Sequence, residues 1–182
     1  MKGLRFGAGL FLFFDLLYFD GMDLTDFISK LDANTQEVMD CANNHGNKGD
    51  SNEGAWTALE TLEHVFITEK VVLKMMRMPG EQAEKEELFG EGKLNHLLAK
   101  REHKVESPDF LKPNGRFSSV EEWTSAFAEM RDQLKKDLGA GVLQLGKEQL
   151  PHPYLGQMTK NDWMYFLIAH ANRHVVQVKE LT

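Results

Sequence analysis

Apolar residues recur at helical spacing in four separate stretches of this chain, and that period limits the fold more than any other feature of the sequence. In the first stretch, Leu24, Phe27, Leu31 and Val38 succeed one another at intervals of three, four and seven residues, which is the spacing of one face of an α-helix. The predicted helices begin near Asp23, near Ser51 or Asn52, at Ser118 or Ser119, and after Thr159. Four such helices bury their apolar faces by packing together, so the sequence predicts an all-α fold built as a four-helix bundle.

Residues at the predicted helix ends support these boundaries. Glu121 and Glu122 come directly after the paired serines and Val120 at the start of the third helix, where carboxylates interact favourably with the positive end of the helix dipole. Thr159 is placed to cap the fourth helix, with Asp162 in the position that a capping box gives to its acidic residue. The second helix is expected to stop at Pro79 and Gly80.

Two long stretches between the helices contain residues that interrupt regular structure. Residues 79–118 include Pro108, Pro113 and Gly115, with room for a short helix around Leu94 to Arg101. The length of this stretch predicts a crossover connection, as in bundles whose neighbouring helices run parallel. Residues 139–157 contain the sequence LPHPYLG, whose prolines and glycine exclude a regular helix.

Length and charge restrict the class of protein. A chain of 182 residues suffices for one domain with a substantial core. The net charge of -7 argues against nucleic-acid binding, which relies on clustered Lys and Arg. The single cysteine, Cys41, excludes an internal disulfide and a cysteine metal cluster, and fits a reducing cytoplasm. We expect Cys41 to pack in the interior rather than to act as a nucleophile.

Residues 1–21 differ in character from the rest of the chain. Lys2 and Arg5 precede an apolar run, residues 6–14, that superficially resembles a signal peptide, but Asp15 and Asp20 interrupt the apolar character of the residues after it. The run is too short to span a bilayer, so no membrane association is expected. We therefore expect residues 1–21 to be an N-terminal extension outside the fold, and one domain to occupy residues 22–182.

Histidines in the second and fourth predicted helices form the candidate site. His170 and His174 lie four residues apart, so their Cβ atoms are about 5–6 Å apart on one helix face, a spacing typical of metal ligands. The alternative is a pair of core histidines bonded to carboxylates or backbone. His64 is the natural third ligand, and three imidazoles would leave coordination positions open, as catalytic sites do. The other histidines are expected to be solvated or structural: His45, His96, His103 and His152.

Several motifs occur in an order and at spacings that resemble the DinB-like metalloprotein superfamily, from Met22 to Leu181. They are Trp56 and ETLEHVFITEK in the second helix, the segment from Ser107 to Pro113, the HP-x-x-G stretch from His152 to Gly156, and W-x6-H-x3-H-x2-Q from Trp163 to Gln177. The resemblance implies an up-up-down-down four-helix bundle with long crossover connections, often a homodimer. It also implies a divalent metal ion held by His64, His170 and His174. Zinc, nickel and iron are the candidate ions, because imidazole suits each of them.

Members of the superfamily that the chain resembles include thiol S-transferases, which act on a small thiol and an electrophilic small molecule. The expected enzyme class is therefore a metal-dependent thiol transferase or a hydrolase. Ala171 stands where a zincin protease has its catalytic glutamate, so a protease of that type is excluded. Glu60 and Gln177 could approach the ligands as hydrogen-bonding partners or proton carriers. The alternative is a non-enzymatic dimeric helical bundle whose metal site is structural or vestigial.

Overall fold

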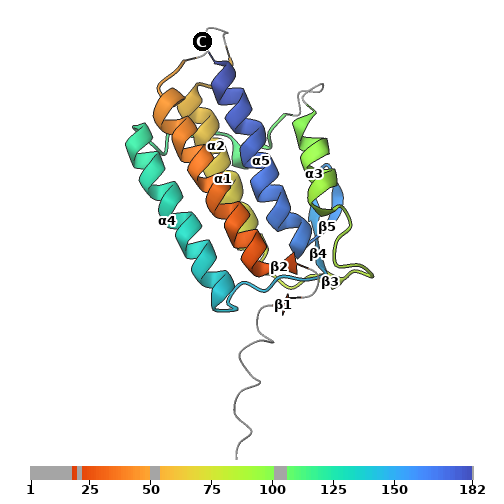
Figure 1. Cartoon of the computed structure of the whole chain (residues 1–182). Coiled ribbons are helices and arrows are strands. Elements are labelled where there is room, and N and C mark those ends of the chain that lie inside the picture. Colours follow the sequence, from red (N-terminus) through yellow and green to blue (C-terminus); the bar gives the residue numbers. More distant parts are fainter. Residues whose placement is uncertain (1–17, 20–21, 50–53, 101–105, 182) are drawn as a thin grey trace, which may run out of the picture.

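Four long helices lie side by side in the computed structural model, which describes residues 18–19, 22–49, 54–100 and 106–181 (Figure 1). A shorter helix and one 3₁₀ turn lie in the connection between the second and third long helices. The elements are α1 (Leu24–His45), α2 (Ala58–Met75), α3 (Gly90–Ala99), η1 (Asp109–Leu111), α4 (Val120–Gly139) and α5 (Lys160–Glu180). The described part of the chain is therefore mostly helical, as the apolar periodicity predicts.

Side-chain caps define where the long helices begin. Thr159 accepts a hydrogen bond from the backbone of Asp162, which completes the predicted capping box of α5. The predicted start of α4 is confirmed, because Ser119 accepts from the Glu122 N–H. The start of α2 was predicted too early: Ser51 and Asn52 lie outside the described residues, and the helix begins only after a second capping box, Thr57 with Glu60.

The short helix α3 occupies residues 90–99. It was predicted around Leu94 to Arg101, so its start is earlier than expected, whereas Arg101 lies outside the described residues. His103 lies outside them as well, as does nearly all of the N-terminal extension, residues 1–21. Of that extension the structure describes only β1 (Tyr18–Phe19), which pairs antiparallel with β2 (Met22–Asp23).

The directions of the long helices follow from contacts between their ends. The Ala58 N–H at the start of α2 donates to Lys48 O just after α1, at 3.0 Å, so α1 and α2 are antiparallel. Arg77 and Asp137 form an ion pair where α2 and α4 end, and these helices run in the same direction. Lys48 also bonds the backbone at the end of α5, Leu181 O, at 2.8 Å, so α1 and α5 are parallel.

The helix order is accordingly up-down-down-up, and the predicted up-up-down-down order is wrong. The physical reason is that α2 begins beside the end of α1, where the Ala58 N–H donates to Lys48 O. The connection between α2 and α4 then has to return along the length of the helices, because these two neighbours are parallel. Among the four long helices, α1 and α5 are the other parallel pair in contact.

A three-stranded antiparallel sheet packs beside the start of α5 and was not predicted from the sequence. Its order is β3 (Glu81–Gln82), β4 (Glu148–His152), β5 (Gly156–Thr159). Pro151 is accommodated because only the first two residues of β4 pair with β3, so its missing N–H interrupts no ladder there. Gly156, with φ of 79°, closes the hairpin opposite His152. As predicted, the segment LPHPYLG contains no helix.

The interior consists of two apolar clusters, one toward each end of the helices. The cluster nearer the sheet contains Leu31, Val72, Leu134 and Leu167 among its buried residues. The cluster at the opposite end contains, as its main members, Val38, Leu62, Trp123, Phe127 and Val175. Burying such side chains stabilises the fold by about 1.5–3 kcal/mol each. No helix in the described part of the chain is long and apolar enough to cross a membrane.

Candidate metal centre

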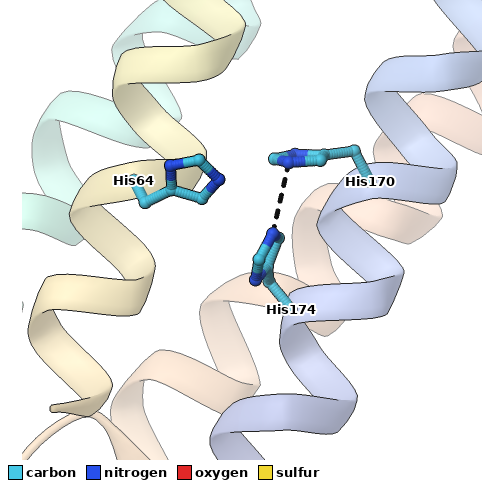
Figure 2. Close-up of side chains that lie close together, drawn as sticks. All are labelled: His64, His170 and His174. Atoms are coloured by element: carbon cyan, nitrogen blue, oxygen red, sulfur yellow. Dashed lines mark hydrogen bonds between the residues drawn. The ribbon is translucent and has the colours of Figure 1, made fainter. Parts of the chain in front are cut away.

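The three predicted ligands lie together between α2 and α5. Figure 2 shows His64 projecting from α2 toward His170 and His174, which project from successive turns of α5. His64 is 6% exposed, His170 8% and His174 9%. They are the only group of at least three metal-binding side chains that converges within the described residues.

The ligand nitrogens have a spacing that suits one small cation. The Nε2 atoms of His170 and His174 are 3.2 Å apart, and the candidate ligand atoms of all three residues lie within 4.8 Å of one another. Zinc bound to histidine at about 2.0–2.1 Å in tetrahedral geometry separates two ligand nitrogens by roughly 3.3 Å. The α5 pair therefore already has the required separation, and His64 needs only a small approach.

Hydrogen bonds on the far side of two rings fix which nitrogen faces the centre. The Nδ1–H of His64 donates to Leu111 O at 2.8 Å, since a carbonyl oxygen can only accept. The Nδ1–H of His174 donates to Gln177 Oε1 at 2.9 Å. Each bond leaves an Nε2 lone pair directed at the other imidazoles, which is how metal-binding histidines are commonly held. Within the described residues, Nδ1 of His170 is buried without a hydrogen-bond partner.

Burial favours the neutral form of two of the three rings, His64 and His170. It lowers the pKa of His64, although the bond to Leu111 opposes that effect. Burial, with the neighbouring His174 and His64, lowers the pKa of His170 well below its usual value. A neutral imidazole has the free lone pair that a metal ion requires, so the site is prepared for a cation at neutral pH.

The two residues predicted as partners of the ligands have different positions. Gln177 is hydrogen-bonded to one of the predicted ligands, His174. Glu60 is engaged at the start of α2, where its carboxylate accepts from the backbone N–H of Thr57 at 2.8 Å and from the Thr57 hydroxyl at 3.0 Å. The structure therefore brings Gln177 to the ligands and uses Glu60 as a helix cap.

Sequence reasoning missed two residues that hold the segment around η1 against α2. Leu111 contributes a backbone oxygen from η1, and no side-chain pattern signals such a contact. Glu63, which adjoins His64, is buried and accepts from the backbone N–H groups of Asn114 at 2.8 Å and Arg116 at 3.1 Å. Together they tie residues 106–117 to the part of α2 that carries His64.

Aromatic rings surround the histidines. Trp56 lies 5.1 Å from His64 between ring centroids, and Phe166 stacks on His170 at 5.2 Å. Phe166 also contacts His152, with ring centroids 5.1 Å apart. The Nδ1 of His152 accepts from the backbone N–H groups of Tyr154 and Leu155, both at 3.1 Å, so this residue has the structural role that was expected.

The other histidines and the cysteine considered in the sequence also lie apart from the site. His45 ends α1 and His96 lies in α3, and neither belongs to the converging group. Cys41 is buried, with Sγ 3.7 Å from Val175 O, and burial raises the pKa of its thiol. It therefore packs as predicted and is held in the unreactive thiol form.

Comparisons with known proteins show which family the chain belongs to. The family model described as the DinB superfamily matches residues 25–178. An uncharacterized protein of Bacillus subtilis (strain 168), YuaE, is 26% identical over 126 residues, which cover 69% of this chain and 76% of that protein. No solved structure matches significantly. Because the family model covers most of the chain, including all three histidines, this protein belongs to the DinB superfamily.

Proposed function

We propose that this protein binds one divalent metal ion through His64, His170 and His174 and is a metal-dependent enzyme of the thiol-transferase or hydrolase type. The observation that carries the proposal is the convergence of three imidazoles, two of which are fixed through Nδ1 so that Nε2 faces the others. We further propose that the four long helices form a bundle of the DinB type. A cytoplasmic homodimer completes the proposal.

The donor set suits zinc, nickel or iron(II), all of which accept imidazole ligands. A bound divalent ion supplies either a hydroxide, by lowering the pKa of its water, or a small thiol held as thiolate. Three neutral ligands leave the full dipositive charge of the ion uncompensated, which favours an anionic fourth group. The protein contributes position and shielding, since Trp56 and Phe166 pack against the ligand rings and restrict water there.

Metal analysis tests the first part of the proposal. Protein purified without a histidine tag should contain about one divalent ion per chain, and His170→Ala should remove it. The matched control is His96→Ala, which removes an exposed histidine outside the converging group and should leave the metal content unchanged. Metal-free wild-type protein of full stability would contradict the enzyme assignment.

Turnover tests the second part. A thiol transferase should consume a small thiol in the presence of a haloarene electrophile, in a reaction that stops when a chelator removes the metal and resumes when it is restored. If a panel of thiols gives no turnover, metal-dependent hydrolysis of ester and amide substrates is the next reaction to measure.

The burial of the ligands favours a second candidate. Because each of the three side chains is less than a tenth exposed, the ion could instead serve the fold of a non-enzymatic dimeric bundle. In that case metal removal would lower the melting temperature without the loss of any reaction, and no thiol or ester would compete with a chelator for the ion.

A further inference from the structure

A chain of polar side chains, three of them buried and Asn172 half-buried, connects all four long helices. Glu69 on α2 accepts from Arg131 on α4 through Nε at 2.7 Å and also through Nη2. The same Nη2 donates to Asn34 Oδ1 on α1 at 3.1 Å. Asn34 Nδ2 donates in turn to Asn172 Oδ1 on α5 at 2.7 Å. We refer to these four residues as the polar chain.

The polar chain lies between the two apolar clusters. On α1, Asn34 falls between Leu31 of one cluster and Val38 of the other, and Arg131 on α4 falls between Phe127 and Leu134. Glu69 and Arg131 are 0% exposed, and Asn34 is 5% exposed. The core is therefore interrupted at one level by a polar layer to which every long helix contributes.

Net stability does not explain such a layer. Burying an arginine and a carboxylate costs several kcal/mol of solvation, which their attraction only approximately repays. Hydrogen bonds of fixed direction, in contrast, select one axial alignment among helices whose apolar faces tolerate several. The amide of Asn34 has no freedom here, because it accepts from Arg131 and donates to Asn172.

Both ends of the polar chain lie on the helices that hold the histidines. Glu69 comes little more than one turn after His64 on α2, and Asn172 lies midway between His170 and His174 on α5. Two residues correspond to about 200° of helix rotation, so Asn172 faces α1 while the imidazoles face α2. The bond from Asn34 therefore holds α5 from the side opposite its ligands.

We propose that the polar chain is a positioning device that fixes the axial register and rotation of α5 against α2 and so sets the distance of His64 from His170 and His174. This inference rests on the proposed metal site. The four residues do not touch the ion in this arrangement, and they act through the helix backbones that carry its ligands.

Cobalt(II) is a suitable probe because its visible absorption reports the geometry of its ligands. In full-length protein, Asn172→Ala should change the cobalt(II) spectrum and weaken cobalt binding by about tenfold or more. Asn172→Asp retains an oxygen that accepts from Asn34 and should restore the wild-type spectrum. The matched control is Asn44→Ala, since the exposed Asn44 donates to the backbone of its own helix, at Asp40 O, and its loss should leave the protein like wild type.

A second measurement tests the polar chain without any metal. The Nδ1 protons of His64 and His174 are held in hydrogen bonds and should give downfield proton NMR signals in metal-free protein. Asn172→Ala and Asn34→Ala should shift or broaden both signals, whereas Asn44→Ala should not. Circular dichroism establishes that each variant remains folded.

The two measurements separate the two proposals. A wild-type protein that takes up no cobalt contradicts the proposed metal function, and the imidazole proton signals then decide the role of the polar chain. A folded Asn172→Ala variant that retains the wild-type cobalt spectrum and affinity, or unchanged imidazole signals where no cobalt binds, overturns the positioning role.

Discussion

A histidine ligand needs the correct tautomer as well as the correct place, and in this protein each of two rings obtains it from one neighbouring oxygen. Leu111 O holds His64, and Gln177 Oε1 holds His174. The backbone oxygen cannot be changed by substitution, but the amide can. The contribution of tautomer control to metal binding can thus be measured at Gln177.

Replacing Gln177 with leucine should lower metal affinity by about 10–100-fold, because His174 loses the acceptor that fixes its Nδ1 proton. Gln177→Glu keeps an oxygen in that position and should bind metal more tightly than the leucine variant. Competition with a chromophoric chelator measures both constants. Equal affinities for wild type and Gln177→Leu would show that Gln177 does not contribute.

His152 illustrates how a half-buried imidazole couples folding to pH. Burial lowers its pKa to about 4 from the usual value of 6.5. Between these values the unfolded chain binds a proton that the folded protein does not, so the stabilising contribution is complete above pH 6.5 and is lost as the pH falls toward 4. Asparagine could accept the same two backbone bonds without titrating.

We expect wild type to lose more stability than His152→Asn when the pH is lowered from 7 to 4.5. One pKa unit corresponds to about 1.4 kcal/mol, and with allowance for the solvent-exposed part of the ring the difference should be about 1–2 kcal/mol. Urea unfolding of both proteins at both pH values measures it. Identical losses would mean that another group dominates the acid response.

At the scale of the element, α5 stabilises α3 at both ends. The carboxylate of Asp162 accepts from three backbone N–H groups at the start of α3, those of Leu88, Phe89 and Gly90, and also from Thr159 N. At the other end, Arg173 Nη1 donates to Leu98 O at 2.8 Å and Lys100 O at 2.9 Å. Negative charge at the start and positive charge at the end both complement the α3 dipole.

Asp162→Ala should therefore cost about 3 kcal/mol, since one carboxylate caps two helices and its loss leaves several N–H groups without an acceptor. Asp162→Asn retains one oxygen and should cost less. Urea unfolding gives the free energies. Relative to wild type, Asp162→Ala should increase the rate of amide hydrogen exchange more in α3 than in α4. A loss below about 1 kcal/mol for the alanine variant would contradict this role.

The elements differ in how far the sequence could predict them. Thr159 with Asp162, and Ser119, were recognisable because caps depend on residues within three positions of each other. Strand β4 was not, since its alternation is interrupted by Pro151 and its partners lie on β3 and β5. His170 and His174 were predictable from spacing along one helix, whereas the contact of His64 with Leu111 joins residues 47 positions apart.

At the scale of the whole molecule, the helix order could not be read from the periodicity, because an apolar stripe has no direction. It follows from contacts such as Arg77 with Asp137 and Lys48 with Leu181. The polar layer could not be predicted either. Asn34 and Arg131 each interrupt the apolar stripe of their own helix, but nothing in the local sequence indicates that they bond to each other. Only the assembled fold connects both of them to Glu69.

The energetic cost of that layer can be measured through its charged pair. Burial raises the pKa of Glu69, and the Arg131 guanidinium opposes the rise, so the carboxylate depends on its partner to remain charged. Arg131→Met should destabilise the protein by about 3–5 kcal/mol, because it leaves Glu69 buried without a counter-charge. The double variant Glu69→Leu with Arg131→Met removes both charges and should recover most of that loss.

Urea unfolding of wild type, both single variants and the double variant completes a thermodynamic cycle. If the double variant is as unstable as the sum of the single variants, each residue contributes to stability independently of its partner, and the polar layer then acts through packing rather than through charge.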